Sequence, residues 1–173
     1  MSSILIVPIR PVDHADLTQL LSPLEDIFHA SASIEEIKYL DSAFAFDTYR
    51  NQYNSTSLLA KILETYPAAG GKVIGMTSVD LFVPVLTYVF GEAQLDGTSA
   101  VVSSFRLREL FYGYDPNPVL EQQRLLKETV HELGHTFGLI HCHNPECVMH
   151  TSTSVEEIDI KSEHFCSDCA GSI

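Results

Sequence analysis

Cysteine is absent from the first 141 residues of this 173-residue chain, and all four cysteines lie between Cys142 and Cys169. A disulfide framework normally staples a small chain along its whole length, so this distribution argues against one. The clustering indicates a metal-binding site that links residues near the C-terminus. The 45% hydrophobic content supports one globular domain with a conventional core.

Basic side chains are also scarce, with 10 Lys and Arg against 23 Asp and Glu, a formal net charge of −13. This charge repels phosphate backbones and anionic lipids, so we expect neither nucleic acid nor membrane as a partner.

The longest largely apolar stretch, residues 81–91, contains Pro84 and falls short of the roughly 20 residues that span a bilayer. The N-terminus shows neither the basic region nor the cleavage site of a signal peptide. We therefore expect a cytoplasmic protein, and a monomer.

Apolar patterning predicts five strands and three helices. The strands are expected at residues 4–9, 34–40, 72–82, 86–95 and 99–107, with residues 44–54 as a loop. The helices are expected at residues 17–28, 55–66 and 118–137. Asp13 or Asp16 can cap the first helix, which Pro23 should kink or divide. Asp96-Gly97 predicts a hairpin between the last two strands.

The third helix carries the sequence HELGH, in which His131 and His135 are four residues apart. On an α-helix this spacing places both imidazoles about 40° apart in projection, so both reach one cation. Zinc held by neutral imidazoles lowers the pKa of a water molecule toward about 7, and an adjacent carboxylate can accept the proton. Glu132 is placed for this general-base role.

His141 would face away from that cation if the helix continued, because six further residues turn it about 240° around the axis. Gly138 adopts a positive φ at little steric cost and can end the helix, so that His141 returns as a third ligand. A five-residue HExxH pattern alone occurs by chance on polar helices. The glycine and the third histidine at these offsets make chance a poor explanation.

Cys142, Cys147, Cys166 and Cys169 form a C-x4-C pair and a C-x2-C pair, which suits tetrahedral zinc in a closed structural site. Four thiolates leave no position for water, so this second zinc is expected to organise a C-terminal segment too short to form its own core. Disulfides, a redox C-x-x-C pair or an iron–sulfur cluster remain alternatives. The cytosolic context and the pairing pattern favour zinc over them.

HELGHTFGLIH followed directly by Cys142, then C-x-M at 147–149 and C-x-x-C at 166–169, resembles the archaemetzincin family of zinc metallopeptidases. The resemblance implies an α/β (α+β) fold, with a twisted mixed five-stranded sheet backed by helices. It also implies a catalytic zinc on the three histidines with Glu132 as base, and a second zinc on the four cysteines. Met149 matches the methionine turn that lies beneath the metal in metzincins.

The same resemblance suggests an organisation in two parts. Residues 1–140 would form a metzincin-like subdomain with the active-site helix, and residues 141–173 a small zinc-stapled subdomain. In metzincins an edge strand above the cleft pairs with extended substrate, and residues 86–95 are the candidate by analogy.

Three functions compete on this sequence. The leading hypothesis is a zinc metallopeptidase that acts on a peptide or protein substrate. The alternative is a metal-stabilised binding or regulatory module with little peptidase activity. A thiol redox protein built on Cys166 and Cys169 is weaker, because two zinc ions per chain would leave no free dithiol.

Overall fold

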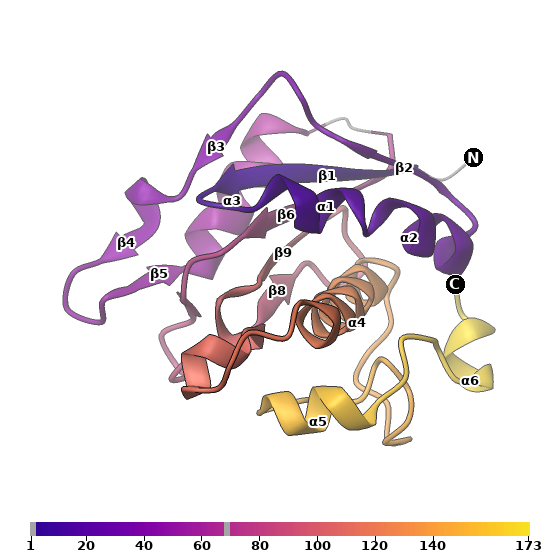
Figure 1. Cartoon of the computed structure of the whole chain (residues 1–173). Coiled ribbons are helices and arrows are strands. Elements are labelled where there is room, and N and C mark those ends of the chain that lie inside the picture. Colours follow the sequence, from indigo (N-terminus) through magenta and orange to yellow (C-terminus); the bar gives the residue numbers. More distant parts are fainter. Residues whose placement is uncertain (1–2, 68–69) are drawn as a thin grey trace.

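The central feature of the fold is a mixed sheet with helices on both faces (Figure 1). The computed structural model describes residues 3–67 and 70–173. The sheet has the order β2-β1-β6-β9-β8, and a short β3 also pairs with β1. Its strands are β1 (Ser3–Arg10), β2 (Ser31–Ile34), β3 (Leu40–Asp41), β6 (Lys72–Thr77), β8 (Gly91–Ala93) and β9 (Ser99–Ser103). Only β8 is antiparallel to its neighbour among these pairs, so the predicted mixed five-strand sheet is confirmed.

A second, three-stranded sheet has the order β4-β5-β7. Its strands are β4 (Phe46–Asp47), β5 (Gln52–Asn54) and β7 (Leu81–Phe82). The helices are α1 (His14–Thr18), α2 (Leu21–Phe28), α3 (Ser55–Thr65), α4 (Pro118–Thr136), α5 (Val155–Ile160) and α6 (Ser167–Ala170), with 3₁₀ turns at Ala43–Ala45, Phe105–Leu107 and Glu109–Tyr112.

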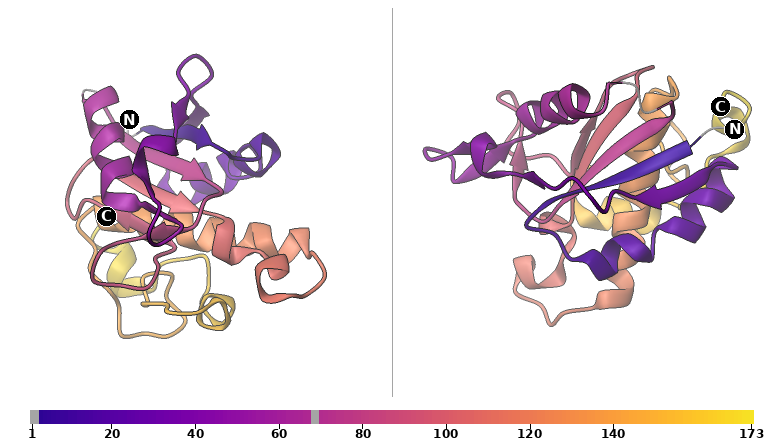
Figure 2. Two further views of the ribbon diagram at one scale, coloured as in Figure 1. Left: turned by 90° about the vertical axis from the view of Figure 1, so that its left-hand side faces the viewer. Right: turned by 90° about the horizontal axis from the view of Figure 1, so that it is seen from above.

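The core is divided by the main sheet, because successive side chains of a strand point to opposite faces. In β9, Val101 packs toward α3, whereas Ala100 and Val102 pack toward α1, α2 and α4. The two views of Figure 2 show α3 on one side of the sheet and α4 on the other. The core on the α4 side also takes in buried residues of the C-terminal segment, among them Val148 and Ile158. That segment therefore packs on the same core as α4.

The predicted first helix is two helices, and the break lies at Gln19–Leu20 rather than at Pro23. Pro23 fits in the first turn of α2, where an amide has no intrahelical acceptor to lose. Asp13 caps α1, with its carboxylate accepting the Ala15 N–H at 2.9 Å. The predicted helix α3 is confirmed, and Asn54 caps it by accepting the Ser57 N–H at 2.9 Å.

Several strand boundaries were predicted wrongly. The strand expected at 34–40 is interrupted, because the Glu35 carboxylate accepts the N–H groups of Ile37 and Lys38 and turns the chain. Of residues 86–95 only β8 is a strand, although the predicted hairpin with β9 is confirmed. The strands expected at 72–82 and 99–107 end at Thr77 and Ser103.

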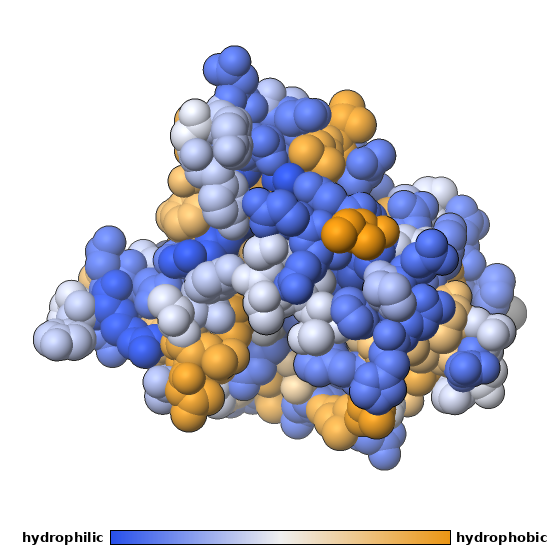
Figure 3. All heavy atoms as spheres, turned by 90° about the horizontal axis from the view of Figure 1, so that it is seen from below, coloured by the Kyte–Doolittle hydropathy of each residue, from blue (hydrophilic) through white to orange (hydrophobic). Residues whose placement is uncertain are grey.

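Two segments expected to be irregular contain regular structure. Residues 44–54 include β4 and β5, and the C-terminal segment contains α5 and α6. Among the described residues, no helix combines the length and the apolar character that a bilayer crossing requires. The face that bears α5 is largely hydrophilic and carries separate hydrophobic patches (Figure 3).

Candidate metal centre and cleft

Helix α4 begins and ends as its sequence predicts. Asn117 caps it by accepting the Leu120 N–H at 3.2 Å, and Pro118 occupies the first turn. The helix ends at Phe137, and Gly138 follows with a φ of +92°. The Gly138 N–H donates to the His135 carbonyl at 3.0 Å, which satisfies one carbonyl at the helix end. The predicted glycine exit is therefore present, and it lets the chain turn back.

The turn brings His141 to the two helical histidines. The ring centroids of His131 and His135 are 4.7 Å apart, and that of His141 lies 5.3 and 5.0 Å from them. One ring nitrogen from each side chain lies within 4.8 Å of the other two. His131 is buried, His135 is half-buried and His141 is exposed, so the triad opens to solvent on one side.

Backbone carbonyls fix the tautomers of both helical histidines. His131 Nδ1 lies 2.8 Å from the Val148 carbonyl oxygen, and His135 Nδ1 lies 2.7 Å from that of Leu139. A carbonyl only accepts, so both Nδ1 atoms donate and both Nε2 atoms carry a lone pair. Burial is the main cause that lowers the pKa of each imidazole in the triad, which favours the neutral ring.

The two Nε2 lone pairs face each other at 3.1 Å. Two acceptors at that distance repel unless a cation lies between them. Tetrahedral zinc with bonds of 2.0–2.1 Å separates its nitrogen ligands by about 3.3 Å. The donor set and its spacing therefore fit a zinc ion, and the carbonyl contacts behind the rings are those that orient metal-bound histidines.

Glu132 lies in the same cleft as the triad but is only 6% exposed. Burial, and next the negative charge of Glu128, raise the pKa of the Glu132 carboxyl well above its usual range in the absence of a cation. A divalent ion on the three histidines would favour the ionised carboxylate instead.

The cleft has a volume of about 640 Å³. One wall is formed by residues 86–93, which include edge strand β8, and the floor by α4 with Glu128 and the first two histidines. Residues 151–153 form the opposite side, and the Tyr88 hydroxyl donates to the Thr153 carbonyl across it. The cleft therefore joins the sheet edge to the segment that follows Met149.

Met149 lies in a tight turn, in which the His150 N–H donates to the Cys147 carbonyl at 2.9 Å. It is fully buried against α4 at Gly134, between the two helical histidines. A β-carbon at Gly134 would lie 2.4 Å from Met149 Sδ. The turn is thus tightly packed against α4 at Gly134.

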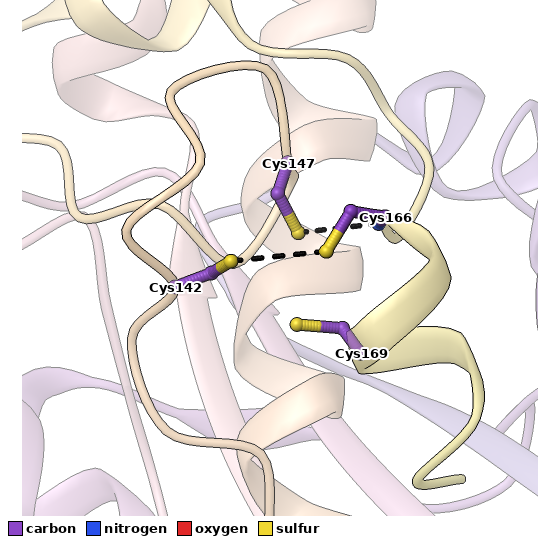
Figure 4. Close-up of side chains that lie close together, drawn as sticks. All are labelled: Cys142, Cys147, Cys166 and Cys169. Carbon is purple, nitrogen blue, oxygen red and sulfur yellow. Dashed lines mark hydrogen bonds between the residues drawn. The ribbon is translucent and has the colours of Figure 1, made fainter.

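The four cysteine side chains point toward a common centre (Figure 4). Their sulfur atoms lie within 4.8 Å of one another, and Cys142 Sγ is 3.8 Å from Cys166 Sγ. That distance is too long for a disulfide, and it matches the roughly 3.8 Å between sulfurs of a tetrahedral site with 2.3 Å zinc–sulfur bonds. The two clusters together suggest two metal sites.

Backbone N–H groups support the sulfurs from outside the cluster. Asn144 N–H donates to Cys142 Sγ and Cys166 N–H donates to Cys147 Sγ, each at 3.4 Å. The backbone N–H of Cys169 is the main cause that lowers the pKa of the Cys166 thiol to about 7. Each N–H favours the thiolate of the sulfur that accepts it, and the thiolate is the form that binds metal, whereas burial raises the pKa of the Cys147 and Cys169 thiols.

The sequence did not predict several residues around the triad. Lys161 is fully buried, and its ammonium lies 2.8 Å from Glu128 Oε1 on the cleft floor. A single lysine directly after α5 gives no local signal of such a position. Gly91 approaches Glu132 closely, and here a signal existed, because glycine inside a strand often marks close approach of another group.

Known proteins share these features. The family model described as peptidase family M54 matches residues 36–173. The archaemetzincin of Methanocaldococcus jannaschii is 38% identical over 96% of this chain and 89% of its own, and that of Pyrococcus furiosus is 40% identical with the same coverage.

Solved structures agree over nearly the whole chain. The archaemetzincin of Archaeoglobus fulgidus is similar with a TM-score of 0.85, 35% identity and 99% of both chains covered. A zinc-dependent peptidase from Methanocorpusculum labreanum is similar with a TM-score of 0.87, 27% identity and 98% of both chains covered.

Proposed function

Because the chain belongs to peptidase family M54, the zinc-dependent archaemetzincins, we propose that it hydrolyses peptide bonds in the cleft between β8 and α4. His131, His135 and His141 would hold the catalytic zinc. The observation that carries this proposal is the pair of facing Nε2 lone pairs at 3.1 Å, which need a cation between them. A bound zinc ion supplies Lewis acidity, which polarises a carbonyl and lowers the pKa of water.

Glu132 is the general base of the proposed reaction. Its carboxylate lines the cleft beside the triad and is shielded from bulk solvent. It accepts a proton from the attacking water and donates it to the nitrogen of the departing amine, so one carboxylate serves both steps. The side chain occupies the space that a β-carbon at position 91 would need, so the glycine makes room for it.

The second zinc of the proposal lies on the four cysteines. The sulfur spacing and the N–H groups that donate to two sulfurs support a closed site of four thiolates. It would hold residues 141–173 as the smaller of two subdomains, with residues 1–140 as the larger. Met149 would be the methionine turn beneath the catalytic zinc.

The substrate is a peptide or protein, and we place it along β8. This strand ends the order of the main sheet and lines the cleft, so its free edge can pair with an extended peptide. The natural substrate would then contact both β8 and residues 151–153. The monomeric state and the cytoplasmic location remain predictions from the sequence.

The test combines metal analysis with the Glu132→Gln substitution. The wild-type chain should hold two zinc ions and hydrolyse members of a peptide library, and a chelator should abolish hydrolysis. Glu132→Gln should keep both zinc ions and lose at least about 100-fold in kcat, because proton transfer contributes that much. Full activity of this variant would rule out the assigned base. A wild-type chain that binds peptides without hydrolysing them would favour the binding module instead.

A further inference from the structure

The cysteine cluster and the histidine triad touch each other at several points, although they are separate sites. His141 and Cys142 are neighbours in the chain, so one peptide bond joins a member of each cluster. Consecutive Cα atoms are about 3.8 Å apart, which means that a shift of one ligand moves the other. The Cys142 carbonyl is further held by His150 Nδ1 at 2.9 Å.

The second connection runs through one buried residue, Val148. Val148 directly follows Cys147, and its carbonyl accepts the Nδ1–H of His131 at 2.8 Å. The Val148 N–H donates to the His164 carbonyl at 3.1 Å, two residues before Cys166. The residue whose carbonyl orients the first histidine thus follows Cys147 in the chain and is hydrogen-bonded to a residue two positions before Cys166.

The third connection is direct packing on α4. Phe165 precedes Cys166, and its ring edge would lie 3.2 Å from a β-carbon at Gly134. Met149, two residues after Cys147, would lie closer still at 2.4 Å. Both side chains therefore pack closely against the helical turn between His131 and His135.

The segment that carries these contacts has little regular structure of its own. Residues 137–154 contain no helix or strand, so no regular ladder of backbone hydrogen bonds fixes them. A chain of this kind loses considerable conformational entropy when it is ordered, and a metal clip offsets that loss. What the four cysteines bind will therefore decide how well the contacts to the triad are preorganised.

We propose that Cys147 and Cys142 are positioning residues for the catalytic metal, and that metal on the four cysteines raises the zinc affinity of the three histidines. The proposal rests on the two-metal assignment and does not depend on peptidase activity. Partners that orient metal-bound histidines typically change metal affinity by 10- to 100-fold, so we expect a coupling factor of that size. The coupling is reciprocal by thermodynamic necessity.

The experiment measures zinc affinity by chelator competition in the full chain. Cys169→Ser removes one sulfur, and it should weaken zinc binding at the histidine site by about 10- to 100-fold. Cys169→His keeps four ligands and should restore most of the affinity, since three thiolates and one imidazole also hold structural zinc. In Leu58→Ala, a core change in α3 on the opposite face of the sheet, histidine-site affinity should be unchanged.

A second variant measures the coupling in the opposite direction, from the histidine site to the cysteine site. His135→Ala disables the histidine site without touching either His131 or His141, which make the junction contacts. It should also weaken zinc binding by the four cysteines, because coupling between two binding sites acts in both directions. Unchanged affinity of the four cysteines in His135→Ala, an unchanged histidine site in Cys169→Ser, or an equal loss in Leu58→Ala would each overturn the proposal.

Native mass spectrometry covers the case in which Cys169→Ser does not fold. Zinc is added stepwise to the metal-free wild-type chain. The second zinc ion should bind more tightly than two independent sites would bind it, with the affinity of an uncoupled cysteine site taken from His135→Ala. If the two-zinc species instead forms as independent affinities require, the sites are not coupled. A failure to hydrolyse peptides leaves this result unaffected.

Discussion

Gly91 lies directly against Glu132, with no room for a side chain between them. A β-carbon at position 91 would lie 2.6 Å from Glu132 Cγ and 2.7 Å from its Oε1. The third close atom is the Val101 carbonyl oxygen on β9, also at 2.7 Å. Strand β8, on which we place the substrate, and helix α4, which carries the proposed base, are therefore fitted together where position 91 has no side chain.

Gly91→Ala should displace the Glu132 carboxylate and lower kcat by about 10- to 100-fold, because small misplacements of a reacting group have effects of that size. Zinc content should stay at the wild-type level, since the three nearest atoms belong to Glu132 and Val101 and to none of the histidines. Gly171→Ala is the control, as its nearest atom would be 3.5 Å away. Equal kcat values for the two variants would contradict the fit.

Gly134→Ala should destabilise the protein, although glycine to alanine inside a helix normally stabilises by up to about 1 kcal/mol. The new β-carbon would meet Met149 Sδ at 2.4 Å, and overpacking of this kind costs about 1–3 kcal/mol. Urea unfolding gives the free energy. Combining it with Met149→Ala should cost less than the sum of the single changes, because the smaller residue makes room. Additive effects would mean that the two residues do not press on each other.

The histidine site was predictable because its information is local. The i, i+4 spacing of His131 and His135 and the positive φ of Gly138 follow from residues within one helix end. The cysteine cluster was predictable for the same reason, since thiol spacing reports the chemistry of the site. The common feature is that the residue type itself carries the signal.

The rest of the site depends on backbone groups and on pairs distant in sequence. The Val148 carbonyl that holds His131 is a group every residue has, so no sequence pattern marks it. Lys161 and Glu128 meet only because α5 and the chain after it pack on α4. The ends of strands were mispredicted for a related reason, because side chains can bind backbone N–H groups that would otherwise pair in the sheet. The Glu35 carboxylate, which accepts two such N–H groups, is the example.

Lys161→Met should lower the free energy of unfolding by about 3–5 kcal/mol, because it leaves the buried charge of Glu128 without a partner. The ammonium lies 2.8 Å from Glu128 Oε1, an oxygen with no other hydrogen-bond partner among the described residues, and Glu128 is only 3% exposed. Adding Glu128→Leu should recover most of the loss, since two apolar groups leave no buried charge. Denaturant unfolding compares the two. A double variant as unstable as the single one would show that packing, not charge, is responsible.

Ala93→Pro tests substrate pairing at the free edge of β8. The Phe90 carbonyl and the Gln94 N–H bond to β9, so the alternation of an antiparallel ladder turns the amide of Ala93 toward the open edge. Proline removes that N–H without breaking a bond inside the sheet.

If an extended peptide pairs there, KM for a peptide substrate should rise about 10-fold, which is the effect of losing one to two net hydrogen bonds, while zinc content stays unchanged. Ala93→Ser keeps the N–H and should leave KM near the wild-type value. A KM equally raised in both variants would assign the effect to the side chain, and a KM unchanged in both would place the peptide elsewhere in the cleft.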